Sequence, residues 1–398
     1  MQVCLASLHP RILSGQIDSM VGLGRALSRR GHRVRLVAPF DATGLLEGSL
    51  ASLDTGPHRL SSAVSNMLRA VPKIIDQARE ADLVHLALPT PAFGLVAEYV
   101  RAHTATPLLV SYEGHLVPAR RVLHPQRLRR SWKTYLPLWG VNNGLVARLG
   151  PHSAPLYVVS SDYQGRELRS IGVPGDRIAI VPNIIEYSKL SQCEPEIARR
   201  QFGIALDGEV LGYIGHFNDV KGVDVLARAF LEVARERPSS RLALAWSGQG
   251  NGDEIRHLLT PVKDRVTWLG KVHVGRFLSA VDVLALPYRL TAGQGAYPSL
   301  VLEAMHAGRP VVTSALPLLE ELVGQDQVAL LCPPEDHAAL AQNVLQLLAS
   351  PARRQEMAAA QIRVMATRFA PEALAAQYES LYDSLVSKKE TTASSAAA

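Results

Sequence analysis

The stretch VLGYIGHFNDVKGVDVLARAFLEVAR, residues 210–235, contains the pattern on which the fold prediction rests. A short apolar run, Val210–Ile214, is followed by a polar loop and then by an amphipathic segment, Gly222–Arg235. An apolar run of this length predicts a β-strand, and apolar residues at helical spacing predict an α-helix. Successive units of this kind build a parallel sheet covered by helices.

The same alternation continues on both sides of this stretch. In the second half of the chain, further strands are predicted at Leu242–Ser247, Val266–Leu269, Val283–Leu286 and Pro310–Thr313, and further helices at Val274–Val281, Ser299–Ala307 and Ala338–Ala349. In the first half, a helix is predicted at Asp18–Arg30 and strands at Gln2–Ser7, Arg33–Ala38, Leu83–Ala87, Leu108–Tyr112 and Tyr157–Ser160. The pattern predicts an α/β protein with two Rossmann-like, doubly wound domains.

The length of the chain and a change in its residue pattern indicate where the two domains meet. A chain of 398 residues exceeds what one hydrophobic core usually organises. Residues 181–196, VPNIIEYSKLSQCEPE, are polar, contain two prolines and lack a periodic pattern, which is typical of a linker. We therefore predict an N-terminal domain at 1–185 and a C-terminal domain at 186–368. The small, polar residues at 389–398 predict a disordered tail.

Composition limits the classes of partner and compartment. The net charge of +6 and the isoelectric point of about 9.3 favour anionic partners such as phosphates, nucleic acid or acidic lipids, without choosing among them. The three cysteines, Cys4, Cys193 and Cys332, match neither metal-site nor disulfide spacing, so we expect a reducing compartment. The sequence shows no signal peptide and no membrane-spanning run, so a cytoplasmic protein is expected.

The loop Gly215–Gly222 carries residue types suited to an anion. Gly215 allows a tight turn after the strand, and Lys221 places an ammonium near the free N–H groups of the following helix. His216 adds a second donor. A plain strand-to-helix connection with solvated polar residues explains the same loop, so phosphate binding is one of two interpretations at this point.

A second candidate loop precedes the helix expected at Ser299–Ala307. Gly293, Gly295 and the small Ala296 permit close approach of a ligand to the backbone, and the helix N-terminus offers N–H groups to a phosphate. Glu303 lies one turn into this helix, where its carboxylate suits the hydroxyls of a ribose. The alternative, an ordinary surface carboxylate, is weakened because the neighbouring helix residues are apolar.

Two loops of the first half are weaker candidates. Gly15 precedes the helix predicted at Asp18–Arg30 and would let backbone N–H groups approach a phosphate or an acceptor. His115 stands beside Gly114, just after the strand at Leu108–Tyr112, where an imidazole suits a sugar hydroxyl or a proton transfer. The alternative is a plain loop histidine, one of 13 in the chain.

Together these residues resemble the retaining glycosyltransferases of family 4, which have the GT-B fold. The resemblance spans nearly the whole chain and is strongest at residues 181–183, 212–230, 268–272 and 297–312. It implies two Rossmann-like domains that face a cleft. It also implies that the last helix, here residues 369–388, crosses back onto the N-terminal domain.

The resemblance also implies roles for individual residues. The family's phosphate-binding lysine corresponds to Lys221, its ribose-binding carboxylate to Glu303 and its active-site histidine to His115, and these three are the expected catalytic residues. The expected donor-binding residues are Gly15, Gln16, Asn183, Gly215, His216, Lys221, Val272, Arg289, Gly295, Ala296, Tyr297, Ser299, Leu300 and Glu303.

Two positions depart from the family pattern. Gly295 stands where the family often has a glutamate that contacts the transferred sugar, which puts the identity of the donor sugar in question. His216 stands where the family commonly has an arginine, so Lys221 or Arg289 would carry more of the positive charge.

The activity implied by the resemblance is retaining transfer of a sugar from a UDP- or GDP-sugar to a hydroxyl acceptor. No metal or other cofactor is expected, and no nucleic acid partner. Cell-envelope polysaccharide, glycolipid or natural-product glycoside synthesis is the expected setting. A non-catalytic relative that binds a nucleotide sugar or glycan, and a sugar-nucleotide epimerase of the same fold, remain open. The absence of GxGxxG followed by an acid argues against a dinucleotide-dependent oxidoreductase.

The segment ARRVLHPQRLRRSWKTYLPLWG, residues 119–140, combines clustered cations with leucine and aromatic side chains. This combination suits an anionic lipid surface, where each cation contributes about 1 kcal/mol. A helix that packs on its own core and a dimer interface are the alternatives. Peripheral membrane contact is therefore one of three interpretations of this segment.

Overall fold

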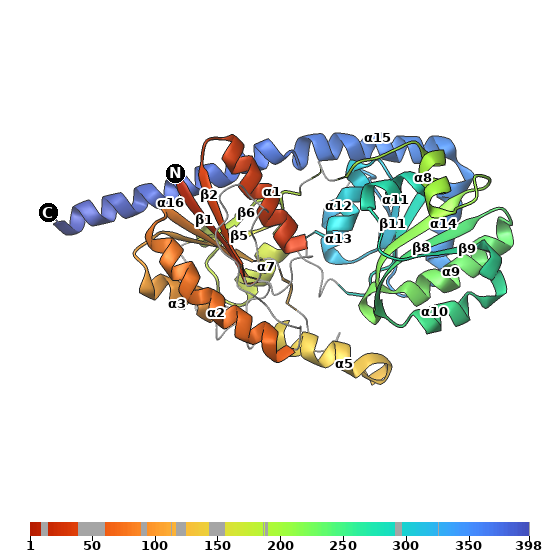
Figure 1. Ribbon diagram of the computed structural model, residues 1–398, viewed down its shortest axis with the longest axis horizontal. Coiled ribbons are helices and arrows are strands. Elements are labelled where there is room, and N and C mark those ends of the chain that lie inside the picture. Colours follow the sequence, from red (N-terminus) through yellow and green to blue (C-terminus); the bar gives the residue numbers. More distant parts are fainter. Residues whose placement is uncertain are drawn as a thin grey trace. The chain divides into compact units, whose positions relative to one another are not determined.

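The computed structural model describes residues 1–8, 15–38, 60–88, 94–112, 114–116, 125–142, 156–185, 187, 190–290, 297–324 and 326–397. The chain divides into two compact units, whose elements are labelled in Figure 1. The N-terminal unit comprises Met1–Glu186, Gln294–Pro298 and Phe369–Ala398. The C-terminal unit comprises Tyr187–Gly293 and Ser299–Arg368.

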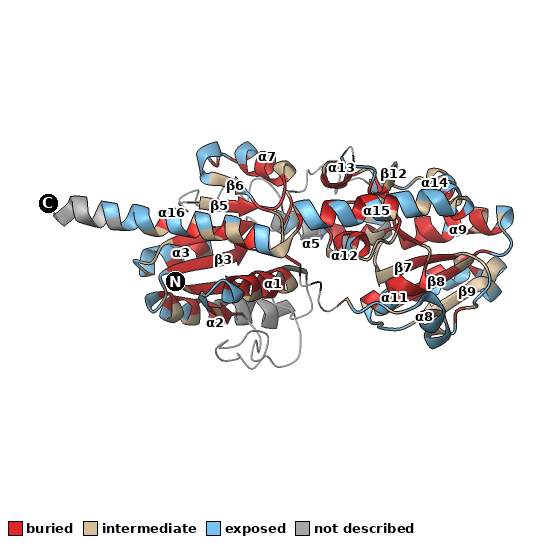
Figure 2. Cartoon of the chain, turned by 90° about the horizontal axis from the view of Figure 1, so that it is seen from above, coloured by how far each residue is buried: buried red, intermediate tan, exposed pale blue. Residues whose placement is uncertain are grey.

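The N-terminal unit contains a six-stranded parallel sheet with the order β2-β1-β3-β4-β5-β6. Its strands are β1 (Gln2–Ser7), β2 (Arg33–Val37), β3 (Leu83–Leu88), β4 (Leu108–Tyr112), β5 (Leu156–Val159) and β6 (Ile178–Ile180). Its helices are α1 (Gly15–Arg29), α2 (Leu60–Arg79), α3 (Gly94–His103), α5 (Pro125–Asn142), α7 (Asp162–Ser170) and α16 (Pro371–Ala397). Figure 2 shows buried residues concentrated in the central strands, as expected for a sheet covered on both faces.

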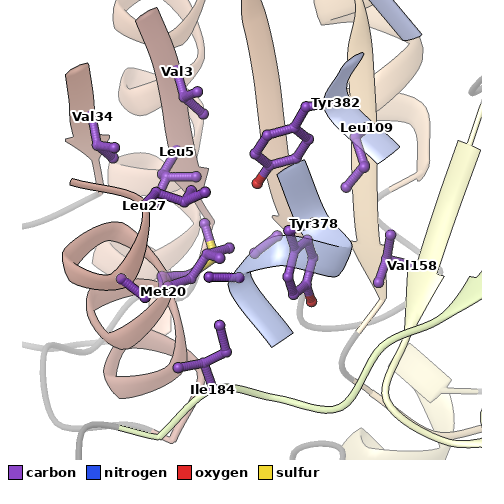
Figure 3. Packing of buried hydrophobic residues seen from close by; sticks show 14 of the residues in the cluster. Val3, Leu5, Met20, Leu27, Val34, Leu109, Val158, Ile184, Tyr378 and Tyr382 are labelled. Carbon is purple, nitrogen blue, oxygen red and sulfur yellow. The ribbon is translucent and has the colours of Figure 1, made fainter. Parts of the chain in front are cut away.

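Helix α16 completes the core of the N-terminal unit. Tyr378 and Tyr382 of this helix pack in one cluster with strand residues and with Met20 and Leu27 of α1 (Figure 3). The Tyr382 hydroxyl lies 2.7 Å from Nδ1 of His85, a fully buried residue of β3. Burial lowers the pKa of His85 to about 3, so this ring is neutral and belongs to the core. The predicted return of the last helix to the N-terminal domain thus has a specific packing partner.

The C-terminal unit contains a second six-stranded parallel sheet, with the order β12-β11-β10-β7-β8-β9. Its strands are β7 (Val210–Phe217), β8 (Arg241–Gly250), β9 (Val266–Leu269), β10 (Val283–Leu286), β11 (Val311–Ser314) and β12 (Leu330–Cys332). Its helices are α8 (Pro195–Phe202), α9 (Val223–Glu236), α10 (Gly252–Leu258), α11 (Val274–Ala280), α12 (Ser299–His306), α13 (Pro317–Val323), α14 (His337–Ala349) and α15 (Pro351–Arg368). Two doubly wound parallel sheets confirm the predicted fold class.

The structure contains elements that were not predicted, among them helices α2, α3, α7, α8, α10, α13 and α15 and strands β6 and β12. Strands β6 and β12 have three residues each, too few to show a periodic pattern. Helix α15 was not predicted, because its sequence alternates arginine, glutamine and alanine with few large apolar residues. Helix α16 continues to Ala397, so residues 389–397 are helical in place of the expected disordered tail. Alanine and lysine favour continuation of a helix that packing has already begun.

Gly222 brings two connections of the C-terminal unit together. It ends the short 3-10 turn Asp219–Lys221, begins α9, and has a φ of +67°. A Cβ atom at this position would lie 2.0 Å from the carbonyl oxygen of Pro287, in the segment that follows β10. Next to this contact, Arg289 N donates to the carbonyl of Val220 at 2.9 Å. The loop after β7 and the loop after β10 are therefore pressed backbone to backbone.

We predict that Gly222→Ala lowers the free energy of unfolding by about 2–5 kcal/mol. The left-handed backbone costs a non-glycine residue about 1–2 kcal/mol, and displacing a packed backbone adds about 1–3 kcal/mol. Urea unfolding of the full chain measures the difference.

Gly203→Ala is the matched control. Gly203 has a similar φ of +63° at the end of α8, but a Cβ there would meet nothing within 4 Å. This variant should lose only the backbone term, about 1–2 kcal/mol. Equal losses in the two variants would show that the contact with Pro287 is not a constraint.

Candidate functional site

The order of the C-terminal sheet indicates where a ligand would bind in that unit. From β7 the chain builds β8 and β9 on one side, and then returns to add β10, β11 and β12 on the other. The direction in which successive strands are added reverses between β7 and β10. These two strands pair in parallel, with Val283 opposite Leu211. Ligands of such sheets bind beyond the carboxyl ends of the strands at this reversal. The predicted residues Lys221 and Glu303 follow β7 and β10, respectively, in the sequence.

The end of β7 is shaped by Gly215. Its φ is +148°, and a Cβ at this position would lie 3.1 Å from the hydroxyl of Tyr213. That hydroxyl donates to the carbonyl of His216 at 2.7 Å, and the register with β8 shifts between Gly215 and Phe217. Nδ1 of His216 forms a hydrogen bond with the Ser247 hydroxyl of β8. His216 is therefore anchored to the neighbouring strand at the edge of the candidate site.

Lys221 is placed by the 3-10 turn that follows β7. Asn218 caps this turn by accepting a hydrogen bond from Lys221 N at 3.2 Å. The ammonium of Lys221 lies 4.8 Å from the centroid of the Tyr288 ring, a distance that allows a cation–π interaction. Burial lowers the pKa of Lys221 to about 8. A partly desolvated cation at the end of this strand is a strong attractor for an anion.

The charge of Glu303, on α12, acts on the same tyrosine. Burial raises the pKa of Tyr288, and the negative charge of Glu303 raises it further. The same two causes raise the pKa of Tyr187, whose ring stacks on His306 of α12 at 4.1 Å between centroids. Tyr288 is thus the common neighbour of Lys221 and Glu303, and its hydroxyl stays protonated. Both predicted residues therefore interact electrostatically with Tyr288.

Arg289 has a different environment from the one expected. Its side chain is 1% exposed and forms ion pairs with Asp219 at 3.1 Å, Asp224 at 2.7 Å and Glu335 at 2.9 Å. It also donates to the carbonyl of Asp219 at 2.6 Å. These carboxylates occupy and neutralise the guanidinium, which argues against the direct donor contact that the sequence suggested. Arg289 instead holds the loops after β7 and β10 together.

The other predicted donor residues of this region lie at or near helix starts. Ser299 and Leu300 are the first, half-buried residues of α12, and half-buried Val272 precedes α11 by two positions. Tyr297 is buried, with its ring 5.9 Å from that of Phe369 within the N-terminal unit. Gly295 and Ala296 lie outside the described residues.

The N-terminal unit places His115 just beyond β4. The residue is buried, and its Nδ1 lies 3.0 Å from Oε2 of Glu167 on α7. The other oxygen of Glu167 accepts a hydrogen bond from Leu116 N at 3.1 Å. One turn earlier on α7, the Gln164 amide donates to the carbonyl of Gly114 at 3.2 Å. Helix α7 therefore holds the loop on both sides of His115.

The remaining predicted residues of this unit are only partly described. Asn183 lies after β6, and its side-chain oxygen accepts a hydrogen bond from the Ser160 hydroxyl. Gly15 and Gln16 are the first two residues of α1, and the structure does not describe their side chains. Most of the loop before them lies outside the described residues.

Three residues of the two sites were missed by the sequence patterns: Gln164, Glu167 and Tyr288. Glu167 is 52 residues from His115 in the sequence, and the helix that carries it was not predicted. Tyr288 follows an apolar strand and looks like one more core residue. The sequence around Glu167 and around Tyr288 contains no motif that indicates their contacts. Within the described ranges, no group of three or more His, Cys, Asp or Glu residues could hold a metal ion.

The basic segment forms α5 over residues 125–142. Tyr135 is fully buried, which agrees with packing of one helix side on the protein core. Trp132 is 58% exposed and Leu136 is 46% exposed. None of the described helices is long and apolar enough to cross a bilayer.

Two family matches cover most of the chain. Residues 14–189 match the family described as Glycosyltransferase Family 4, and residues 208–350 match the family described as Glycosyl transferases group 1. The chain is similar to D-inositol 3-phosphate glycosyltransferase from Corynebacterium aurimucosum, with 30% identity over 251 residues, 58% of this chain and 57% of that protein. It is also similar to N-acetyl-alpha-D-glucosaminyl L-malate synthase from Bacillus anthracis, with 24% identity over 60% of this chain and 62% of that protein. These matches span less than two thirds of either relative.

Solved structures share the fold of the whole chain. Sucrose-phosphate synthase from Thermosynechococcus elongatus has a TM-score of 0.74 and 22% identity, and the match covers 98% of this chain and all of that one. HepE from Anabaena, solved in complex with UDP, has a TM-score of 0.73 and 18% identity over 96% of this chain and all of that one. With the two parallel sheets and the two family matches, one covering most of each sheet unit, the chain belongs to the family 4 glycosyltransferases and has their GT-B fold.

Proposed function

We propose that this protein transfers a sugar from a UDP- or GDP-sugar to a hydroxyl acceptor with retention of anomeric configuration. The observation that carries the proposal is the ammonium of Lys221, which lies over Tyr288 near the reversal point of the C-terminal sheet, with the charge of Glu303 acting on the same tyrosine. The negative charge of a diphosphate would offset part of the cost of burying this cation. HepE, a structural neighbour, was solved in complex with UDP and with UDP-glucose, which supports a nucleotide sugar as the ligand.

The chemical task is to stabilise a departing nucleoside diphosphate. Lys221 and the first N–H groups of α12 would attract the charge that grows on the leaving phosphate. Glu303 would accept hydrogen bonds from the ribose hydroxyls. The leaving phosphate would itself take the proton of the acceptor hydroxyl, so no separate base is required. His115 would then position a hydroxyl group of a substrate.

We predict that Lys221→Ala lowers kcat/KM for sugar transfer about 100-fold or more while the protein stays folded. The reason is the loss of a preorganised cation at the leaving group. A coupled assay of nucleoside diphosphate release measures the rate, and circular dichroism reports folding. Lys263→Ala is the control, because Lys263 is an exposed lysine in the connection between α10 and β9. If Lys221→Ala kept the rate of the control, the lysine would have no part in the reaction.

The pKa of Lys221 predicts a dependence on pH. Because this pKa lies at about 8, the ammonium is present below pH 8 and is lost as the pH rises through this value. The raised pKa of Tyr288 keeps that neighbour neutral over the same range. We expect kcat/KM for the donor to fall up to about tenfold per pH unit above about 8.

Lys221→Arg tests the assignment of this descending limb. An arginine keeps its charge throughout the range, so the variant should show a lower plateau but no fall near pH 8. The comparison uses kcat/KM, which reports the pKa values of the free enzyme. A descending limb at the same pH in both proteins would assign it to another group.

The proposed role of Glu303 gives a prediction about nucleotide affinity. Glu303→Gln should weaken UDP or GDP binding about 10- to 100-fold, since hydrogen bonds to a charged group contribute about 1.5–3 kcal/mol. Isothermal titration calorimetry measures this loss. The same nucleotide without its 2′- and 3′-hydroxyls should bind both proteins alike. A similar loss for that analogue would contradict contact with the ribose.

A further inference from the structure

The carboxylate of Glu167 contacts two consecutive residues, the imidazole of His115 and the backbone N–H of Leu116. Its Oε2 atom lies 3.0 Å from Nδ1 of His115, and its Oε1 atom accepts from Leu116 N at 3.1 Å. Glu167 is buried, with only 8% of its surface exposed. On the same helix, the Gln164 amide donates to the carbonyls of Tyr112 at 3.3 Å and Gly114 at 3.2 Å. Two side chains of α7, one turn apart, therefore fix the position of the imidazole.

The chemistry of these partners places the proton of His115. A glutamate carboxylate only accepts hydrogen bonds, and a backbone N–H only donates. Nδ1 of His115 must therefore carry a proton to bond Oε2, and in this Nδ1–H tautomer the lone pair of the ring lies on Nε2. Nε2 is buried and has no hydrogen-bond partner in the described part of the chain. A buried acceptor without a partner calls for a ligand or a water molecule.

The surroundings of the ring are polar as well. The ring of Tyr163 lies 5.6 Å from that of His115. The hydroxyl of Tyr112, the last residue of β4, is a second buried polar atom with no hydrogen-bond partner among the described residues. Burial raises the pKa of Tyr112, and the charge of Glu167 raises it further, so this hydroxyl stays protonated.

We propose that Glu167 is a positioning residue that holds the proton of His115 on Nδ1, so that Nε2 accepts a hydrogen bond from a substrate hydroxyl. The hydroxyl belongs to the transferred sugar or to the acceptor, and this part of the inference rests on the proposed function. The placement of the proton does not. A lone pair at Nε2 selects a hydroxyl group and disfavours a phosphate, since an ionised phosphate has no proton to donate.

Glu167→Gln is the variant that separates proton placement from loop support. The amide has a single oxygen, which must serve the obligate donor Leu116 N. Its NH2 group then faces Nδ1 of His115 and drives the ring proton to Nε2. Gln164→Ala is the matched control. It removes the hydrogen bonds to the carbonyls of Tyr112 and Gly114, and the one from Ser160 N, but leaves the carboxylate opposite Nδ1.

The tautomer is measured on the free protein by two-bond ¹H–¹⁵N correlation spectra of histidine-labelled samples, with His115→Asn to identify the signal. Wild type and Gln164→Ala should carry the proton on Nδ1, and Glu167→Gln should carry it on Nε2. A wild-type ring protonated on Nε2, or an unchanged tautomer in Glu167→Gln, would overturn the proposal. This readout needs no substrate, so it stands whether or not the protein proves to be a transferase.

Kinetics with deoxygenated substrates identify the hydroxyl. Glu167→Gln should lower kcat/KM about 10- to 100-fold with complete substrates, because a buried hydrogen bond is lost and a partner is left unpaired. With the one donor or acceptor analogue that lacks the recognised hydroxyl, wild type and variant should react alike, and that analogue names the source. Gln164→Ala should lower all rates by a common factor. An equal defect of Glu167→Gln on every analogue would reduce Glu167 to loop support. Absence of transfer from every nucleotide sugar would instead refute the proposed function.

Discussion

The contact between the loop after β7 and the loop after β10 is the constraint on which the C-terminal site depends. The α-carbon of Gly222 leaves no room for a side chain beside the Pro287 carbonyl, and Arg289 N bonds the carbonyl of Val220. Because this contact joins the two loops at the reversal point of the sheet, Lys221 comes to lie over Tyr288. The position of the cation is thus set by the backbone, which a ligand cannot easily displace.

Arg289 stabilises this arrangement through charge. A buried guanidinium costs several kcal/mol in lost hydration, and three carboxylates with good geometry offset that cost. The carboxylates come from two different segments of the chain. Asp219 and Asp224 follow β7, whereas Glu335 follows β12. Arg289 therefore holds these loops together, and its charge is neutralised by its carboxylate partners. Burial lowers the pKa of Lys221, so an incoming anion would stabilise its ammonium.

The sequence predicted the fold well because its main signals are local. Buried parallel strands are continuous apolar runs, so β4, β9 and β10 were predicted with their observed bounds. The site was predicted in part, because Lys221 and Glu303 sit in motifs at the ends of such strands. The roles of Arg289 and Glu167 could not be predicted, because their partners lie up to 70 residues away and depend on strand order. A buried arginine and a ligand-binding arginine are alike in sequence.

The two units use opposite devices to prepare a polar group for a ligand. In the C-terminal unit, burial destabilises the charge of Lys221, and an arriving anion would relieve that cost. In the N-terminal unit, Glu167 satisfies Nδ1 of His115 and leaves Nε2 without a partner in the described part of the chain, so a hydroxyl would relieve an unmet hydrogen bond. One device responds to charge and is sensitive to pH, whereas the other responds to a proton donor. The device in the C-terminal unit matches a diphosphate, and the device in the N-terminal unit matches a hydroxyl group.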